Sequence, residues 1–82
     1  MYLKILGTRY NLAEFDLFIN EVNGSCISVI ELLVDCSIDE FDKKGLEDTF
    51  LVETDKLTYV FSDFEINEFY EENGSVKIIC VK

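Results

Sequence analysis

Two stretches of the chain share one pattern and decide the fold: Tyr10 to Leu17 reads YNLAEFDL, and Tyr59 to Ile66 reads YVFSDFEI, 49 positions later. All matched positions but one keep their chemistry: aromatic, large apolar, small, acidic, Phe, acidic and branched apolar. The tripeptide Asn-Gly-Ser also recurs, at 23–25 and at 73–75. Repetition of one supersecondary unit is a strong architectural signal. It predicts two related β-hairpin units joined by a linker.

The rest of the sequence predicts a mainly β protein. Val, Ile, Phe, Tyr and Thr are frequent, turn signals come at short intervals, and Pro is absent. We expect one domain, 1–82, of about seven antiparallel strands, arranged as a small antiparallel barrel or a two-sheet sandwich. The repeat divides it into pseudo-repeated hairpin units at about 1–36 and about 49–82. Four strands and two turns are predicted directly: strands Tyr2–Leu6, Tyr10–Val22, Thr49–Thr54 and Leu57–Phe61, and turns Gly7-Thr8 and Asp55-Lys56.

Each repeat contains a change of phase in its alternating pattern. In the first copy, apolar residues fall on one parity up to Leu12 and on the other from Phe15 onward, and the second copy switches in the same way. A shift of one residue exchanges the two faces of a strand. The sequence therefore predicts a β-bulge or a tight turn at Ala13-Glu14 and again at Ser62-Asp63.

The dipeptide Asn-Gly between two β-like runs is typical of a hairpin turn. In the second unit, a three-residue loop with Gly74 in the left-handed conformation pairs Tyr70 with Val76 and Ile66 with Cys80. This register gathers the apolar side chains on one face, whereas the two-residue register scatters them, so we favour the former. The first unit does not discriminate between the two registers.

The linker at 37–48 is predicted to contain one short helix. Ser37 followed by Glu40 is a capping box, and Gly45 is a natural helix stop. We expect a helix over Ile38 to Lys44 that caps one end of the β structure or covers an edge.

The balance of charged residues limits the classes of partner that the protein is expected to bind. The chain has 17 acids against 7 bases and no His, for a formal charge of −10. We expect no direct nucleic-acid binding, because Lys and Arg contacts to phosphate dominate that affinity. The apolar start is too short for a signal peptide and no run is long enough for a membrane helix, so a cytoplasmic protein without membrane contact is expected. An acidic surface serves solubility, or it attracts a basic protein or nucleoprotein complex.

Little in the sequence supports catalysis. His, the usual general base near neutral pH, is absent. The pairs Glu14/Asp16 and Asp63/Glu65 are more typical of a solvated rim than of an acid–base pair. We therefore expect no enzyme, no catalytic residues and no cofactor.

Three Cys residues occur, at positions 26, 36 and 80, without CxxC spacing. An odd number argues against a disulfide framework, and three thiolates without His argue against a zinc site. Apolar neighbours surround each one. We expect all three to be small core side chains and no metal site.

An acidic and aromatic surface is the strongest candidate for a binding site. Alternation places Phe18 and Phe69 among acidic residues on the face opposite the expected core. Aromatic side chains ringed by carboxylates are typical of protein-binding surfaces. The alternative is that both Phe side chains lie inside, between two sheets or under the helix. The candidate partner-binding residues are Glu14, Asp16, Phe18, Asp63, Glu65, Phe69, Glu71 and Glu72.

In size, acidity and the absence of His and Pro, the whole chain is similar to small anti-defence proteins of bacteriophages, including anti-CRISPR proteins. The resemblance implies an inhibitor in the host cytoplasm that places carboxylates where a basic bacterial defence protein holds nucleic-acid phosphates. Two alternatives stay open. One is a phage structural or assembly module that pairs through an edge strand such as Tyr2–Leu6 or Leu57–Phe61, for example as a homodimer. The other is an immunity-type protein that neutralises a basic toxin.

Overall fold

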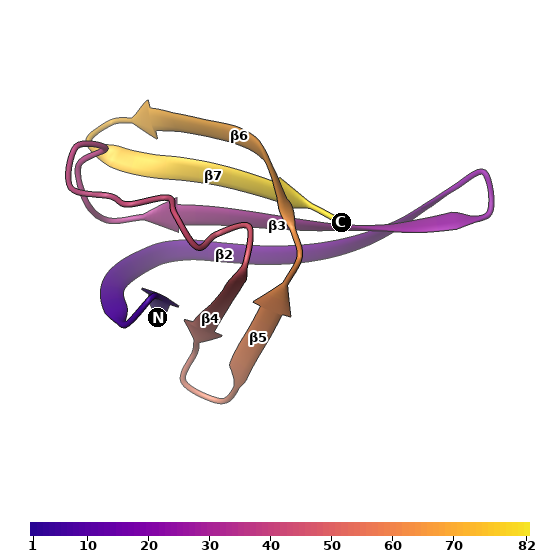
Figure 1. The fold of residues 1–82 in the computed structure, drawn as a ribbon, viewed down its shortest axis with the longest axis horizontal. Coiled ribbons are helices and arrows are strands. Elements are labelled where there is room, and N and C mark those ends of the chain that lie inside the picture. Colours follow the sequence, from indigo (N-terminus) through magenta and orange to yellow (C-terminus); the bar gives the residue numbers. More distant parts are fainter.

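A computed structural model describes all residues, 1–82, and shows a single antiparallel sheet of seven strands (Figure 1). The strands follow the sheet order β5-β4-β1-β2-β3-β7-β6. No helix is present, and so none that could cross a membrane. The strands are β1 (Tyr2–Ile5), β2 (Thr8–Val22), β3 (Ser25–Val34), β4 (Thr49–Glu53), β5 (Thr58–Ser62), β6 (Glu65–Glu72) and β7 (Ser75–Val81).

Strand β2 is long enough to belong to both halves of the sheet. Its first residues, Thr8 to Asn11, pair with β1, and the residues from Glu14 onward pair with β3. Between these parts the register shifts at Leu12/Glu14, which confirms the first predicted bulge. A bulge increases the local bend and twist of a strand. The two halves of the sheet therefore face each other across a shared core.

The core lies on the concave side of this bent sheet. Phe50 and Phe61 come from the β4–β5 half, and Ile30, Ile78 and Cys80 come from the β3–β7 half. All five are buried. Full burial of each large apolar side chain contributes roughly 1.5–3 kcal/mol.

Neither the predicted barrel nor the two-sheet sandwich is present. The sheet ends at β5 and β6, which are not hydrogen-bonded to each other, so it does not close. It is also one sheet, because β2 runs through both halves. The chain turns sharply between β5 and β6 at Asp63, which has a φ of +62°, and this turn carries the two edge strands in different directions.

The linker contains no helix, which corrects the sequence prediction. Ser37 and Glu40 form only an isolated turn, in which the Glu40 N–H donates to the Ser37 carbonyl at 3.1 Å. The Phe41 ring instead packs between Tyr10 and Phe69, with ring centroids 4.8 and 5.7 Å apart. Tertiary packing of Phe41 outweighs the local helix signal here.

The backbone path of the second half of the linker depends on Gly45. Its φ is +93°, and a Cβ at this position would lie 2.9 Å from both Ile5 Cγ2 and Leu6 Cγ. The close approach buries Leu46 completely. The linker thus crosses the concave side of the sheet in front of β3 and β7 (Figure 1).

Three hairpins turn through two residues with positive φ. The turns are Leu6-Gly7, Asn23-Gly24 and Asn73-Gly74. Two-residue turns of this kind match the twist of the flanking strands. The predicted turn at Gly7-Thr8 was one residue too late, and the predicted three-residue loop at Gly74 was wrong.

A second bulge explains the error at Gly74. Ile66 pairs with Cys80 as predicted, but Tyr70 pairs with Lys77, and the register shifts between Ile66 and Glu68. The extra residue, Asn67, moves the face change away from the turn.

The cysteines have three different environments, and none forms a disulfide. Cys80 is fully buried, and Cys36 is partly buried against the core. Cys26 lies exposed on the hairpin between β2 and β3, so the prediction that all three are core side chains was wrong for this one.

Candidate functional site

The convex side of the β2–β3–β7–β6 half carries most of the acidic candidates. Directly paired residues of antiparallel strands project from the same face of a sheet, so the pairing defines rows of side chains across it. One row is acidic: Asp16 pairs with Glu31, Glu31 with Ile79, and Ile79 with Glu68. Three of its four side chains are carboxylates.

The adjacent row is apolar and ends in an acid. Phe18 pairs with Val29, Val29 with Val81, and Val81 with Glu65. The Phe18 side chain is 45% exposed, and the two valines are partly exposed. This row places an aromatic anchor directly beside the carboxylates.

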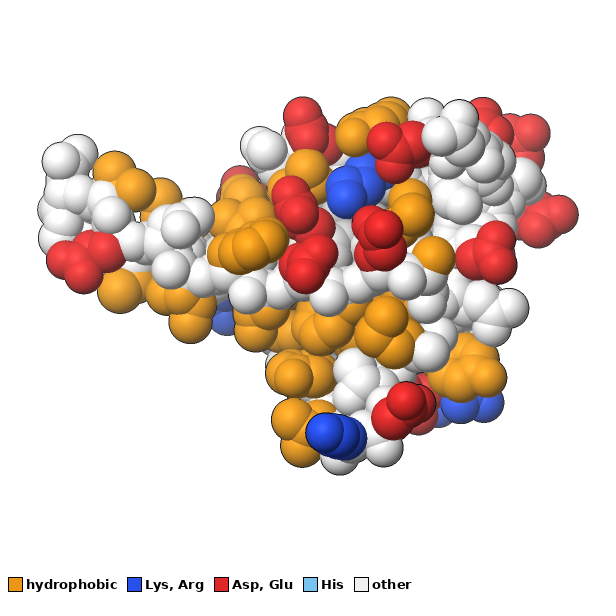
Figure 2. Space-filling view, turned by 180° about the vertical axis from the view of Figure 1, so that it is seen from behind, with side chains coloured by type: hydrophobic (Ala, Val, Ile, Leu, Met, Phe, Trp, Pro, Cys, Tyr) orange, Lys and Arg blue, Asp and Glu red, His pale blue; other side chains and the backbone are white.

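A third row holds the only base on this face. Glu14 pairs with Leu33, Leu33 with Lys77, and Lys77 with Tyr70. Figure 2 shows acidic side chains gathered around a basic one, with apolar side chains that continue onto the protruding hairpin. We call this surface the acidic outer face; its charged residues are Glu14, Asp16, Glu31, Glu65, Glu68, Glu72 and Lys77, and its anchor is Phe18.

The opposition of Asp16 and Glu31 costs stability. Like charges directly across an antiparallel pair destabilise it by up to about 1 kcal/mol. Neither carboxylate forms an ion pair, since the single ion pair of the structure, Arg9 Nε to Glu53 Oε1 at 3.4 Å, lies in the other half of the sheet. An unfavourable local choice that stability does not explain is typical of a functional surface.

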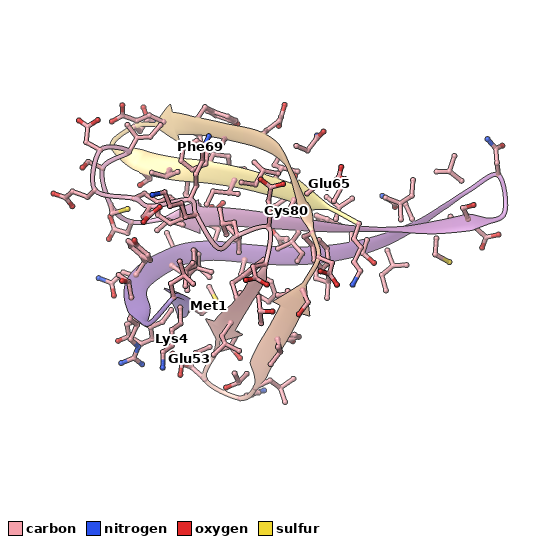
Figure 3. The ribbon with its side chains drawn as sticks, viewed as in Figure 1. Met1, Lys4, Glu53, Glu65, Phe69 and Cys80 are labelled. Atoms are coloured by element: carbon pink, nitrogen blue, oxygen red, sulfur yellow. The ribbon has the colours of Figure 1, made fainter.

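The structure separates the two predicted aromatic anchors. Phe18 is exposed on the outer face, but Phe69 lies on the concave side, against Phe41. Lys43 Nζ lies 5.2 Å from the centroid of the Phe69 ring. Figure 3 shows Phe69 on β6, beside the linker. The bulge at Asn67 causes this, because it reverses the facing of every β6 residue that follows.

The predicted acids also divide between the faces. Glu14, Asp16, Glu65 and Glu72 belong to the outer face, and Glu71 has the concave parity. Asp63 is exposed at the turn between β5 and β6, where its N–H donates to the Asp48 carbonyl at 3.0 Å.

Two acids of the face were not predicted. Glu31 is a lone acid within the apolar β3 sequence SCISVIELLV, and that isolation was the available signal. Glu68 could not be placed without knowing the bulge at Asn67, because unbroken alternation assigns it to the core side.

The remaining chemistry of the structure is limited. No group of three or more His, Cys, Asp or Glu side chains is placed to hold a metal ion. Burial raises the pKa of the Cys80 thiol to about 11, with a smaller contribution from Glu47. Burial also raises the pKa of the Cys36 thiol, helped by Glu40 and Asp35. Both shifts disfavour the thiolate, which is the reactive form.

One open depression lies at the turn end of the β4–β5 hairpin, in the other half of the sheet from the acidic outer face. Half of its lining is apolar, and it contains one acid and one lysine. It is lined by Met1, Thr54, Asp55, Lys56, Leu57 and Tyr59.

Comparisons with protein-family models, with curated proteins and with solved structures found no match.

Proposed function

We propose that this protein is a binding module whose acidic outer face docks onto a basic protein. The observation that carries the proposal is the directly opposed pair Asp16 and Glu31, which forms no ion pair and lies beside the exposed ring of Phe18. A cationic partner converts this repulsion into attraction. Phe18 supplies an apolar contact beside these carboxylates.

The partner we propose is a nucleic-acid-handling protein of a bacterial defence system, inhibited in the manner of phage anti-defence proteins. A channel that binds phosphates is lined with Lys and Arg, and rows of carboxylates are complementary to it. The net charge of −10 supports this choice, because it speeds encounter with a basic surface.

We also infer that the fold arose by duplication of a hairpin unit. Leu3 pairs with Val52, 49 positions later, and Ile30 pairs with Cys80, 50 positions later. These offsets match those of the sequence repeat, as expected if a two-fold axis relates the units. The two units differ at this surface, since Phe18 pairs with Val29 whereas its counterpart at an offset of 50, Glu68, pairs with Ile79.

Charge reversal tests the binding proposal. The double variant Asp16→Lys/Glu31→Lys changes the outer face, and Asp39→Lys/Glu40→Lys changes the net charge equally on the exposed linker. Each tagged protein is used to capture partners from bacterial lysate, with elution by a salt gradient. We expect a basic protein to be retained by the native chain and the linker variant, to be released by moderate salt, and to be lost by the outer-face variant.

Equal retention by the outer-face variant would contradict the proposal. To exclude unfolding of the variant as the cause of lost capture, the stability of the single variant Asp16→Lys is measured. This change replaces a repulsive pair by an attractive one, so the free energy of unfolding should rise by about 0.5–1 kcal/mol while capture weakens. Loss of capture together with loss of stability would not support the proposal.

A further inference from the structure

The sheet has a long free edge in its middle. Strand β1 covers only Thr8 to Asn11 of β2, so β2 has no partner on that side from Glu14 to Val22. The end of this segment and the start of β3 form a hairpin that protrudes beyond the C-terminus of β7 (Figure 1). We call this free edge the β2 edge.

The two terminal edges of the sheet are better protected. The β5 edge has five residues, and Lys82 Nζ donates to the Ser62 carbonyl at its end, at 2.9 Å. The β6 edge is bulged at Asn67 and carries four Glu residues. Natural proteins block exposed edges by short strands, bulges and charges. The β2 edge is uncharged from Leu17 to Asn20 and has no bulge after Ala13.

The backbone of Leu17 and Ile19 points outward from this edge. Successive residues of a strand direct their backbone N–H and C=O groups to opposite sides. Ser28 of β3 exchanges both backbone hydrogen bonds with Lys82, on the β7 side. The next residue, Val29, therefore bonds on the β2 side, to Phe18. The alternation leaves the N–H and C=O groups of Leu17 and Ile19 without a strand partner. These groups are available to a further strand.

Apolar side chains lie on both faces of the β2 edge. Leu17 is 41% exposed and Ile19 is 70% exposed on the concave side, and Phe18 and Val22 are exposed on the outer side. Residues on both faces of one strand are covered together only if another strand extends the sheet beside it.

We propose that the β2 edge pairs antiparallel with the β2 edge of a second copy of this chain, about a two-fold axis at Phe18. In this register Leu17 lies opposite Ile19 of the second copy, and these residues carry the outward backbone groups that must bond. Phe18 meets Phe18 on the outer side, and Asp16 meets Asn20. The edge is thus complementary to itself.

Charge disfavours some of the alternative registers. A two-fold axis at Asp16 would place the two copies of Asp16 opposite each other, and an axis at Glu21 would do so for the two copies of Glu21. Like charges directly opposite each other are destabilising, in a chain that already carries −10. An axis at Phe18 brings no two acids opposite each other within Phe15 to Glu21. It also aligns the acidic outer faces of the two copies into one surface.

Amide hydrogen exchange measured by NMR as a function of protein concentration tests this pairing residue by residue. In the free chain, we expect the Leu17 and Ile19 amides to exchange fast and the Phe18 and Asn20 amides to be protected by β3. Over about a hundredfold rise in concentration, we expect Leu17 and Ile19 to gain protection while sedimentation shows a dimer. Fast exchange at these two positions in a dimer, or a monomer throughout, would overturn the proposal.

A matched pair of proline variants separates the β2 edge from other edges. Ile19→Pro removes an outward N–H without touching the β2–β3 ladder, and Glu71→Pro does the same on the β6 edge. We expect the dimer dissociation constant to rise at least about tenfold for Ile19→Pro and to stay unchanged for Glu71→Pro. Equal effects would show that the β2 edge is not the contact.

Salt distinguishes this pairing from the binding of a basic partner. Two chains of charge −10 repel, so added salt should strengthen the dimer, whereas it should weaken docking of the acidic outer face to a basic protein. A dimer that weakens with salt would contradict edge pairing and leave the proposed function unaffected.

Discussion

At the residue scale, Cys80 shows how one buried side chain sets an alkaline limit on stability. Its thiol is fully buried among core residues, and burial raises its pKa from the ordinary 9.0 to about 11. The folded chain therefore holds this proton more tightly than the unfolded chain. The resulting stability is complete below pH 9 and is lost as pH rises through about 11.

We predict that the free energy of unfolding falls by up to about 2–3 kcal/mol from this thiol between pH 9 and pH 11. Urea unfolding at several pH values measures the fall. Tyr and Lys side chains titrate in the same range, so Cys80→Ala is the control. It lowers stability by leaving a cavity, but the difference between the two profiles should shrink at high pH. Parallel profiles would mean that the thiol does not contribute.

At the scale of elements, the linker shows how a loop can act as part of the core. Phe41 is 7% exposed and contacts rings from β2 and β6, while the Asp42 N–H donates to the Tyr10 hydroxyl at 3.3 Å. These contacts join opposite parts of the bent sheet across its concave side. Since the sheet does not close by hydrogen bonds, such packing substitutes for closure.

We predict that Phe41→Ala lowers the free energy of unfolding by about 3 kcal/mol, because it leaves a cavity between Tyr10 and Phe69. The exposed neighbour Glu40 provides a control, and Glu40→Ala should change stability by less than about 0.5 kcal/mol. Chemical denaturation of both variants gives the comparison. A loss below about 1 kcal/mol for Phe41→Ala would show that the linker is not part of the cooperative core.

Local sequence patterns predicted the strands and turns better than they predicted which face of the sheet each side chain occupies. The phase change at Ala13-Glu14 is visible because apolar residues continue on both sides of it, and the structure confirms the bulge. The bulge at Asn67 is hidden, since the adjacent aromatics Phe69 and Tyr70 follow it and alternation does not show which of them faces the core. This one residue turns Phe69 and Glu71 to the concave side, so two of the eight predicted site residues were misplaced by it.

The predicted helix failed for a different reason. The signals at Ser37, Glu40 and Gly45 are local, and the competing factor is the burial of Phe41 and Leu46 against strands distant in sequence. Helices this short are marginal without a packed apolar face. Sequence alone does not reveal that a bent sheet leaves a concave side for this segment to cover.

At the scale of the whole molecule, unbalanced charge is the dominant electrostatic feature. The chain carries −10 over principal extents of 39 × 26 × 20 Å, and its one ion pair is exposed. Exposed ion pairs contribute little, so repulsion among the acids outweighs attraction. The screening length is about 30 Å at 0.01 M salt and about 10 Å at 0.1 M. Repulsion therefore acts across the whole molecule at low salt and only between near neighbours at moderate salt.

We predict that raising NaCl from about 0.01 M to 0.1 M increases the free energy of unfolding by about 1 kcal/mol, which raises the Tm by about 4–8 °C. Thermal unfolding at low protein concentration measures this without a contribution from self-association. Glu31→Gln removes one acid from the opposed pair on the outer face, so its Tm should start higher and respond less to salt. A Tm that falls with salt would show that attractive charge pairs dominate the surface. The inference that the carboxylates of the acidic outer face are unpaired would then be wrong.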